Sequence, residues 1–280
     1  MPASPALLIV TDLDGTLLDH ETYSVEAARP ALDRLSELRI PVIFNTSKTA
    51  IESQLLGESL GLSDPFIVEN GSAIFFPKRR FPVAPTNCKS AHSCWLLELG
   101  SHHETISEQL DTLATQFNFH ALSRMDVKTV MERTGLSMTA AQRAQKREYS
   151  EAIAWEDNEE AFEQFRQALA GHGLHLLRGG RFWHVLGDTD KGRAQQALRD
   201  VVPAFADCRI AALGDSQNDV AMLENADIAA IIRSPAHPAP SVHSQRPPLY
   251  SQACGPAGWA ECVDRILQEF TIPRRGNHHG

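Results

Sequence analysis

The sequence predicts an α/β protein built on a doubly wound parallel sheet with an inserted α+β domain. The branched apolar run 7–10 is typical of a strand buried on both faces. A strand, a helix and a second strand follow one another through residues 7–44, which indicates a right-handed parallel crossover. After residue 85 that alternation is lost. The predicted divisions are a first core part over 1–84, an inserted domain over 85–187, a second core part over 188–270 and a flexible tail over 271–280.

The first core part is predicted from hydrophobic spacing and turn residues. Ser24 can cap a helix whose alanines and leucines recur every three to four positions up to Leu38. The segment 41–44 is predicted as a second buried strand, followed by a helix from Ala50 to about Gly57. Strands are predicted over 65–68 and 73–76, and the Asn-Gly pair between them is a strong hairpin signal.

The inserted domain and the second core part follow the same kind of pattern. Helices are predicted over 103–117, 126–133, 137–146 and 158–170, and strands over 95–99, 148–155, 174–177 and 181–186. In the second core part, strands are predicted over 209–213 and 226–232, the latter as the last strand of the core. The segment 235–248, rich in Pro, Ser and His, is predicted as a loop, and 258–270 as a final helix.

Composition excludes several classes of partner. The formal net charge of -9 argues against nucleic acid or an anionic membrane surface as a partner. Five cysteines without a Cys-x-x-Cys pair are typical of a reducing compartment and of a chain without structural zinc. Because the sequence has neither a leader-like segment nor an 18-residue apolar run, we expect a cytoplasmic protein. No feature of the sequence predicts an oligomeric state.

Two carboxylates follow the first strand. Asp12 and Asp14 are two positions apart, so their side chains project to the same side if the extended geometry persists. Because such charges repel, the pair implies a divalent cation or a proton held on one of the two. The alternative is that Asp14 and Gly15 form only a turn.

The run Asp12-Leu13-Asp14-Gly15-Thr16 resembles the first motif of the haloacid dehalogenase (HAD) superfamily. The resemblance implies a Rossmann-like HAD core with an inserted α+β cap domain of the C2 type. It also implies that Asp12 attacks a phosphorus atom and that Asp14 protonates the leaving oxygen.

Polar residues also follow the second strand. In a doubly wound sheet the carboxyl ends of neighbouring strands share one crevice, so Thr46 or Ser47 is expected to face Asp12. The resemblance assigns a phosphoryl-binding hydroxyl to Thr46, with Ser47 as the next choice. The alternative is that residues 46–49 only cap the following helix, although helix N-termini also bind phosphate.

The remaining HAD motifs fall after the inserted domain. Lys191-Gly192 resembles the third motif, which implies a lysine that neutralises the nucleophile and the phosphoryl group, whereas an isolated lysine is usually solvated. Asp215 and Asp219 follow a predicted strand, and two acids there require a cation. Oxygen ligands select a hard ion, so we expect Mg²⁺ held by Asp12, the Asp14 carbonyl and Asp215, with Asp219 as a ligand or a support.

A cationic set in the inserted domain indicates the substrate. Segments 45–49, 146–151 and 179–184 resemble mannosyl-3-phosphoglycerate phosphatases, which implies a small phosphorylated, carboxylated, sugar-derived substrate. The alternatives are a sugar-phosphate or general metabolite phosphatase, a sugar phosphomutase, or solvated surface charges. The candidate substrate-binding residues are Ser47, Lys48, Asn70, Arg143, Arg147, Ser150, Arg181 and His184.

Overall fold

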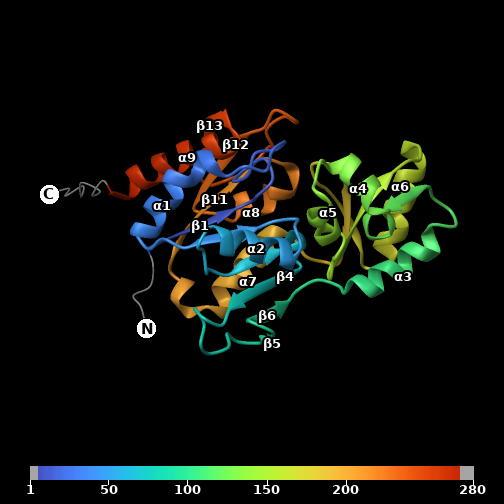
Figure 1. Cartoon of the computed structure of the whole chain (residues 1–280), viewed down its shortest axis with the longest axis horizontal. Helices are drawn as coiled ribbons and strands as arrows, with labels where there is room; N and C mark the ends of the chain where they lie inside the picture. Colours follow the sequence, from blue (N-terminus) through green and yellow to red (C-terminus); the bar gives the residue numbers. More distant parts are fainter. Residues whose placement is uncertain (1–5, 272–280) are drawn as a thin grey trace.

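The computed structural model describes residues 6–271, and its strands form two sheets that lie in different parts of the molecule (Figure 1). Within these residues the larger sheet has the strand order β13-β12-β11-β1-β2-β3-β4-β6-β5. Its parallel strands are β13 (Leu249–Cys254), β12 (Ile228–Arg233), β11 (Arg209–Gly214), β1 (Leu7–Thr11), β2 (Val42–Asn45) and β3 (Phe66–Val68).

Both faces of the larger sheet are covered by helices, as a doubly wound fold requires. Successive side chains of β1 enter opposite cores, Leu7 and Ile9 on one face and Leu8 and Val10 on the other. Helices α1 (Arg29–Glu37) and α9 (Gly255–Thr271) pack on the first face. Helices α7 (Lys191–Val201) and α8 (Val220–Glu224) pack on the second. The predicted fold class is confirmed.

The predicted hairpin is present at the antiparallel end of this sheet. Strand β4 (Ala73–Pro77) returns beside β3 after a 3-10 turn, η2 (Glu69–Gly71). Gly71 has φ +95°, and a Cβ there would collide with the backbone carbonyl of Asp190. A glycine is therefore needed where this turn touches the segment that leads into α7.

The larger sheet extends beyond the expected start of the inserted domain. Strands β5 (Lys89–Ala91) and β6 (Cys94–Glu98) pair antiparallel next to β4. A boundary at residue 84 would cut through this sheet, so we now propose that the inserted domain begins after Glu98. The prediction that 226–232 holds the last strand of the core is also wrong, because β13 follows it in the chain and pairs with β12.

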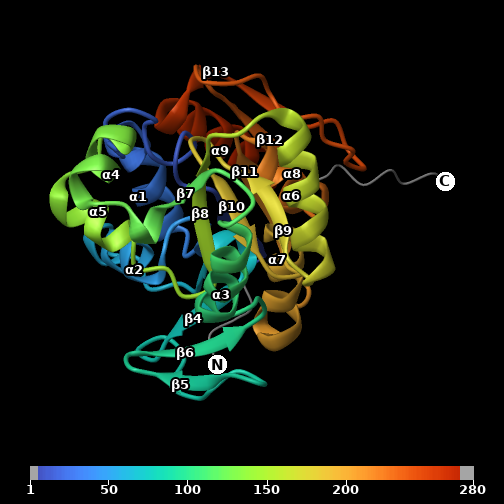
Figure 2. The ribbon, with the colours of Figure 1, turned by 90° about the vertical axis from the view of Figure 1, so that its right-hand side faces the viewer.

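The second sheet is antiparallel and has the order β7-β8-β10-β9 (Figure 2). Its strands are β7 (Phe119–Ala121), β8 (Ser150–Trp155), β10 (Trp183–Leu186) and β9 (His175–Arg178). Helices α3 (His103–Leu113) and α6 (Glu159–Gly171) share one hydrophobic core with it. Helices α4 (Val127–Thr134) and α5 (Met138–Ala144) share a second hydrophobic core with this sheet. This second core lies on the side that faces the larger sheet and its helices (Figure 1). Strand β7 is an addition to the predicted elements.

Two further observations complete the fold. Helix α2 (Ala50–Ser59) begins at Thr49, whose side chain forms a capping box with Glu52. Among residues 6–271, no helix combines the length and the apolar character that crossing a bilayer demands. The predicted tail over 271–280 lies outside the described residues except for Thr271, which ends α9.

Candidate active site

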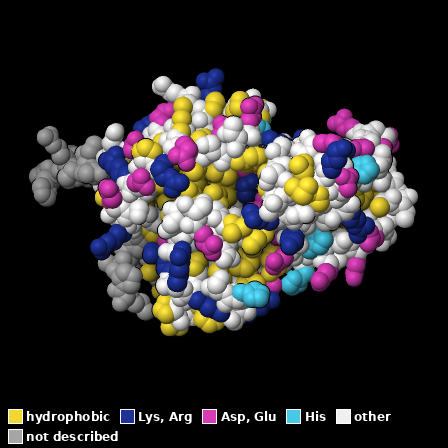
Figure 3. All heavy atoms as spheres, viewed as in Figure 1, with side chains coloured by type: hydrophobic (Ala, Val, Ile, Leu, Met, Phe, Trp, Pro, Cys, Tyr) yellow, Lys and Arg dark blue, Asp and Glu magenta, His cyan; other side chains and the backbone are white. Residues whose placement is uncertain are grey.

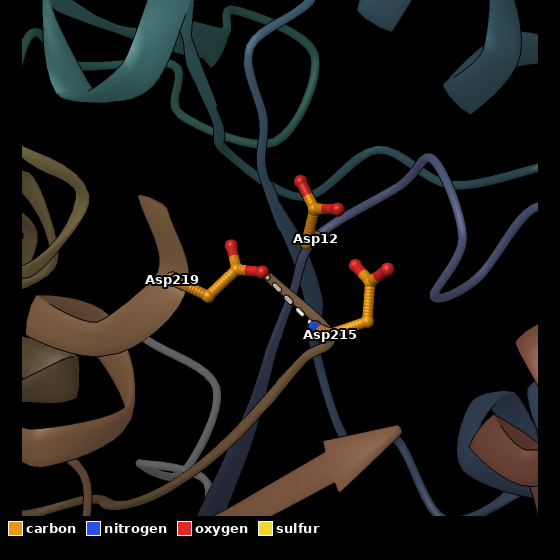
Figure 4. Close-up of side chains that lie close together, drawn as sticks. All are labelled: Asp12, Asp215 and Asp219. Atoms are coloured by element: carbon orange, nitrogen blue, oxygen red, sulfur yellow. Dashed lines mark hydrogen bonds between the residues drawn. The ribbon is translucent and has the colours of Figure 1, made fainter. Parts of the chain in front are cut away.

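Three carboxylates meet at the carboxyl end of the parallel sheet. Asp12 follows β1, Asp215 follows the neighbouring strand β11, and Asp219 ends the short 3-10 turn η5 (Gln217–Asp219). One oxygen from each lies within 4.8 Å of the others, and all three side chains are buried. In Figure 4 the three carboxylates point to the same side. The predicted convergence of two distant acidic motifs is therefore present.

A buried ammonium group joins two of these carboxylates. Lys191 is the first residue of α7, and its Nζ lies 2.6 Å from Asp12 Oδ1 and 2.6 Å from Asp219 Oδ1. The side chain is fully buried. Burial alone would lower the pKa of Lys191, but Asp12 and Asp219 raise it above its usual value. The lysine is therefore not a solvated surface residue.

One ammonium does not neutralise three buried carboxylates. Burial raises the pKa of Asp12 well above its usual value, and Asp219 and Asp215 raise it further, although Lys191 opposes them. Burial and Asp219 likewise raise the pKa of Asp215. Oxygen donors with a residual negative charge fit a hard divalent cation, so these residues could hold a metal.

Asp215 and Asp219 differ in their contacts. Asp219 Oδ2 accepts hydrogen bonds from the backbone N–H groups of Asp215 and Ser216, both at 3.0 Å. Because Lys191 contacts its Oδ1, both carboxylate oxygens of Asp219 have partners. Asp215 instead accepts from the Thr16 hydroxyl at 2.9 Å and lies 3.1 Å from His237 Nε2. Both acids have partners on each oxygen, but Asp215 lines the pocket and Asp219 does not, so Asp215 is the better placed of the two to face a ligand.

Asp14 and Lys48 form an ion pair at the rim of the site. Lys48 Nζ lies 2.9 Å from Asp14 Oδ1. Burial lowers the pKa of Lys48, but Asp14 and Glu52 raise it above its usual value. The structure therefore brings a predicted binding residue against the predicted general acid, a contact that sequence spacing did not indicate.

In the loop after β2, the residue that caps helix α2 is not the residue that lines the pocket. The cap of α2 is Thr49, not Thr46. Thr46 is buried, and its hydroxyl accepts a hydrogen bond from the Lys48 N–H at 3.1 Å. Ser47 lines the pocket beside Asp12. Either hydroxyl remains a candidate for the phosphoryl group.

Asn70, another predicted binding residue, is buried beside the acidic motif. Its Oδ1 accepts a hydrogen bond from Asn218 Nδ2 at 3.0 Å. Its own Nδ2 has no partner among the described residues. Asn218 also lines the pocket, so Asn70 supports the pocket wall from behind.

The inserted domain contributes an arginine to the pocket. Arg147 is buried and donates to the Ser47 carbonyl at 2.8 Å and to the Ser150 hydroxyl through Nε and Nη2. Its Nε lies 3.6 Å from the buried carboxylate of Glu69. Ser150 thus orients Arg147, while Nη1 has no hydrogen bond within residues 6–271 and is left for a ligand.

Of the other residues of the inserted domain that were predicted to bind substrate, some line the pocket and one does not. His184 lines the pocket and is buried, and its Nδ1 has no hydrogen-bond partner in the described part of the chain. Burial and the neighbouring Arg147 lower its pKa well below the usual value, so it is neutral at pH 7. Arg181 also lines the pocket but donates to Tyr23 and to the His20 carbonyl. Arg143 is not among the pocket residues, and its backbone carbonyl contacts Thr49.

The pocket lies between the two parts of the molecule. Its core side is formed by Asp12, Asp14, Ser47, Lys48 and Asp215, and its other side by Arg147, Arg181, His184 and the apolar side chains of Leu122, Leu136, Ala144, Ala152 and Phe182. Figure 3 shows Lys and Arg side chains along this junction. The pocket also contains His20, Tyr23 and His237, which no spacing or motif in the sequence singled out.

Comparisons with known proteins agree with this architecture. A family model described as haloacid dehalogenase-like hydrolase matches residues 9–237. The glucosyl-3-phosphoglycerate/mannosyl-3-phosphoglycerate phosphatase of Methanococcoides burtonii is 38% identical over 263 residues, which cover 93% of this chain and 97% of that protein. The protein of the same name from Persephonella marina is 34% identical over 271 residues, which cover 94% and 98%. The resemblance inferred from short segments is confirmed.

Solved structures share the fold at much lower identity. A Thermoplasma acidophilum protein superposes with a TM-score of 0.65 and 18% identity, covering 94% of this chain and 97% of that one. The sucrose-phosphatase of Synechocystis, solved with sucrose and phosphate, has a TM-score of 0.60 and 16% identity, covering 94% and 98%. These likenesses establish the fold of the chain.

Proposed function

The chain belongs to the haloacid dehalogenase-like hydrolase family, and on that premise we propose that it is a phosphatase of glycosyl-3-phosphoglycerates that uses Mg²⁺. The observation that supports this most is the composition of the pocket. Acidic groups of the core, Asp12 and Asp14, face Arg147 and His184 of the inserted domain. The two relatives named as phosphatases of this substrate class support the same choice.

We assign the covalent chemistry to the first motif. A carboxylate oxygen of Asp12 attacks the phosphorus, and the bond from phosphorus to the substrate oxygen breaks. Asp14, which must release Lys48 and carry a proton for this step, gives that proton to the leaving oxygen, which departs as the alcohol of the glycerate. Asp14 then takes a proton from water, whose oxygen attacks the aspartyl-phosphate and releases inorganic phosphate and free Asp12.

The remaining core residues neutralise and position the phosphoryl group. Lys191 places one positive charge against Asp12, and the hydroxyl of Thr46 or Ser47 donates to a phosphoryl oxygen. Asp12, the Asp14 carbonyl and Asp215 would hold Mg²⁺, which when bound supplies positive charge to the phosphoryl oxygens. Asp219 keeps Lys191 and the backbone of Asp215 in place.

We assign recognition of the glycerate carboxylate to Arg147 and His184. An arginine binds a carboxylate through planar N–H groups, and Arg147 has one nitrogen left for this after its bonds to Ser47 and Ser150. His184 is neutral, and its Nδ1 has no partner among residues 6–271, so it suits a hydroxyl or an uncharged oxygen. Together they distinguish a phosphoglycerate glycoside from a plain hexose phosphate.

The proposal is tested by phosphate release in Mg²⁺ from mannosyl-3-phosphoglycerate, glucosyl-3-phosphoglycerate, 3-phosphoglycerate and hexose phosphates. We expect the highest kcat/KM for the two glycosides. Asp12→Asn should abolish release while the variant keeps the circular dichroism spectrum of the native protein. Equal turnover of the hexose phosphates would contradict the substrate assignment. Little free phosphate together with activation by a bisphosphorylated sugar would indicate a mutase instead.

A further inference from the structure

Tyr23 has a backbone conformation that few aromatic residues adopt. It lies in the loop that leads from β1 to α1 and has φ +57°, in the left-handed region. Asp19 organises this loop, because its carboxylate accepts from the Thr22 N–H at 2.9 Å and its carbonyl accepts from the Tyr23 N–H at 3.0 Å. A strained residue that the surrounding contacts hold in place is often a functional one.

The Tyr23 hydroxyl reaches two separate segments of the inserted domain. It donates to the carbonyl of Thr134, the last residue of α4, at 3.1 Å. It accepts a hydrogen bond from Arg181 Nη1, in the loop between β9 and β10. The same guanidinium donates through Nη2 to the His20 carbonyl at 3.2 Å. One core loop therefore fastens the inserted domain at two points.

The Tyr23 ring lies against the groups that surround the substrate pocket. Lys48 Nζ is 5.1 Å from the ring centroid and also pairs with Asp14. Arg181 Cζ is 5.8 Å from the centroid on the side of the inserted domain. Tyr23 itself lines the pocket, together with Leu136 and Phe182. Cations at these distances are attracted to the face of the ring, which helps to fix their positions.

We propose that Tyr23 determines specificity, because its hydroxyl closes the inserted domain over the pocket and its ring forms the wall that a large substrate contacts. The proposal rests on the phosphatase function and extends it to the choice between large and small esters. A glycosyl-3-phosphoglycerate touches both sides of the pocket and depends on this closure. A small ester such as p-nitrophenyl phosphate needs mainly the core groups and depends on it less.

The kinetic test compares two hydroxyl deletions. Tyr23→Phe keeps the ring and removes both hydrogen bonds, whereas Tyr149→Phe removes a tyrosine hydroxyl that donates to Glu98 at 2.9 Å, outside the pocket. For Tyr23→Phe we expect the ratio of kcat/KM for mannosyl-3-phosphoglycerate to that for p-nitrophenyl phosphate to fall about tenfold, mainly through KM. For Tyr149→Phe we expect an unchanged ratio. Equal shifts in the two variants, or no shift for Tyr23→Phe, would overturn the proposal.

A second measurement does not depend on the substrate. Hydrogen exchange of the free protein should speed up by about tenfold across residues 178–184 in Tyr23→Phe, including the Gly179 N–H that bonds to the Phe182 carbonyl at 3.0 Å. Tyr149→Phe should leave this segment unchanged. Unaltered exchange in Tyr23→Phe would refute the closure. If the wild-type protein does not hydrolyse the glycosides but exchange responds as expected, the assigned substrate is wrong and the closing role of Tyr23 stands.

Discussion

Replacing Lys191 by methionine is the sharpest test of how the site is held together. Methionine keeps a long unbranched apolar chain and removes only the ammonium, so little cavity is created. The ammonium is fully buried and lies 2.6 Å from Asp12 and from Asp219. Without it, these carboxylates and Asp215 are left facing one another.

The magnitude follows from these distances. At 2.6 Å and an effective dielectric constant of ~20, each contact is worth roughly 6 kcal/mol before the desolvation of the lysine is subtracted. Removing one partner of a buried ion pair usually costs about 3–5 kcal/mol, because the other partner stays buried and uncompensated. We therefore expect the free energy of unfolding of Lys191→Met to fall by about 3–5 kcal/mol in EDTA at pH 7.5.

Urea unfolding followed by the fluorescence of the four tryptophans measures this change. The matched control is Lys128→Met, whose ammonium is exposed and 3.9 Å from Glu132, and it should change the free energy of unfolding by less than about 0.5 kcal/mol. Adding Asp219→Asn to Lys191→Met should recover part of the loss, since it removes one of the repelling charges. A fall of less than about 1 kcal/mol in the single variant, or strictly additive losses in the double variant, would refute the reasoning.

Two other changes test separate parts of the site. Asp215→Asn should raise the Mg²⁺ concentration for half-maximal phosphate release at least ~10-fold, since losing even an indirect metal contact often costs that much; an unchanged Mg²⁺ titration would remove Asp215 from the ligand set. The pKa of His184 in the folded protein lies well below its value of 6.5 in the unfolded chain. The free energy of unfolding that this difference contributes is fully present above pH 6.5, and it is lost as the pH falls toward the folded pKa. Between pH 6.5 and 5.5 the native protein should therefore lose about 1 kcal/mol more unfolding free energy than His184→Gln. Parallel pH curves for the two proteins would mean that His184 protonates freely in the fold.

The convergence of the acidic side chains and Lys191 could be predicted because each motif has a fixed place within one strand and the helix or turn that follows it. Asp12 and Asp215 follow strands that pair in parallel with Thr11 opposite Leu213, so their proximity follows from the fold class alone. Lys191 opens α7 and thus points back toward the same edge of the sheet. Strand β6 was assigned to the inserted domain and β5 was not predicted at all, because no motif marks either of them. The segment 89–91 is short and mostly exposed, so only its pairing with β6 places it.

Contacts between the two halves lie beyond what spacing can predict, and Glu69 shows why. Its segment was predicted as a turn, which is correct, yet the turn buries a carboxylate whose partners lie about eighty positions later. Glu69 accepts from the Glu148 N–H at 2.9 Å and from the Ser150 hydroxyl at 2.6 Å, while its own N–H donates to the Lys48 carbonyl at 3.0 Å. Since Ser150 also orients Arg147, Glu69 links the loop beside Asp12, through its backbone N–H, to the arginine assigned to the substrate, through its carboxylate. Each half therefore carries its own charged groups in its sequence, but the distance between Asp12 of the core and Arg147 of the inserted domain is set only when the halves meet.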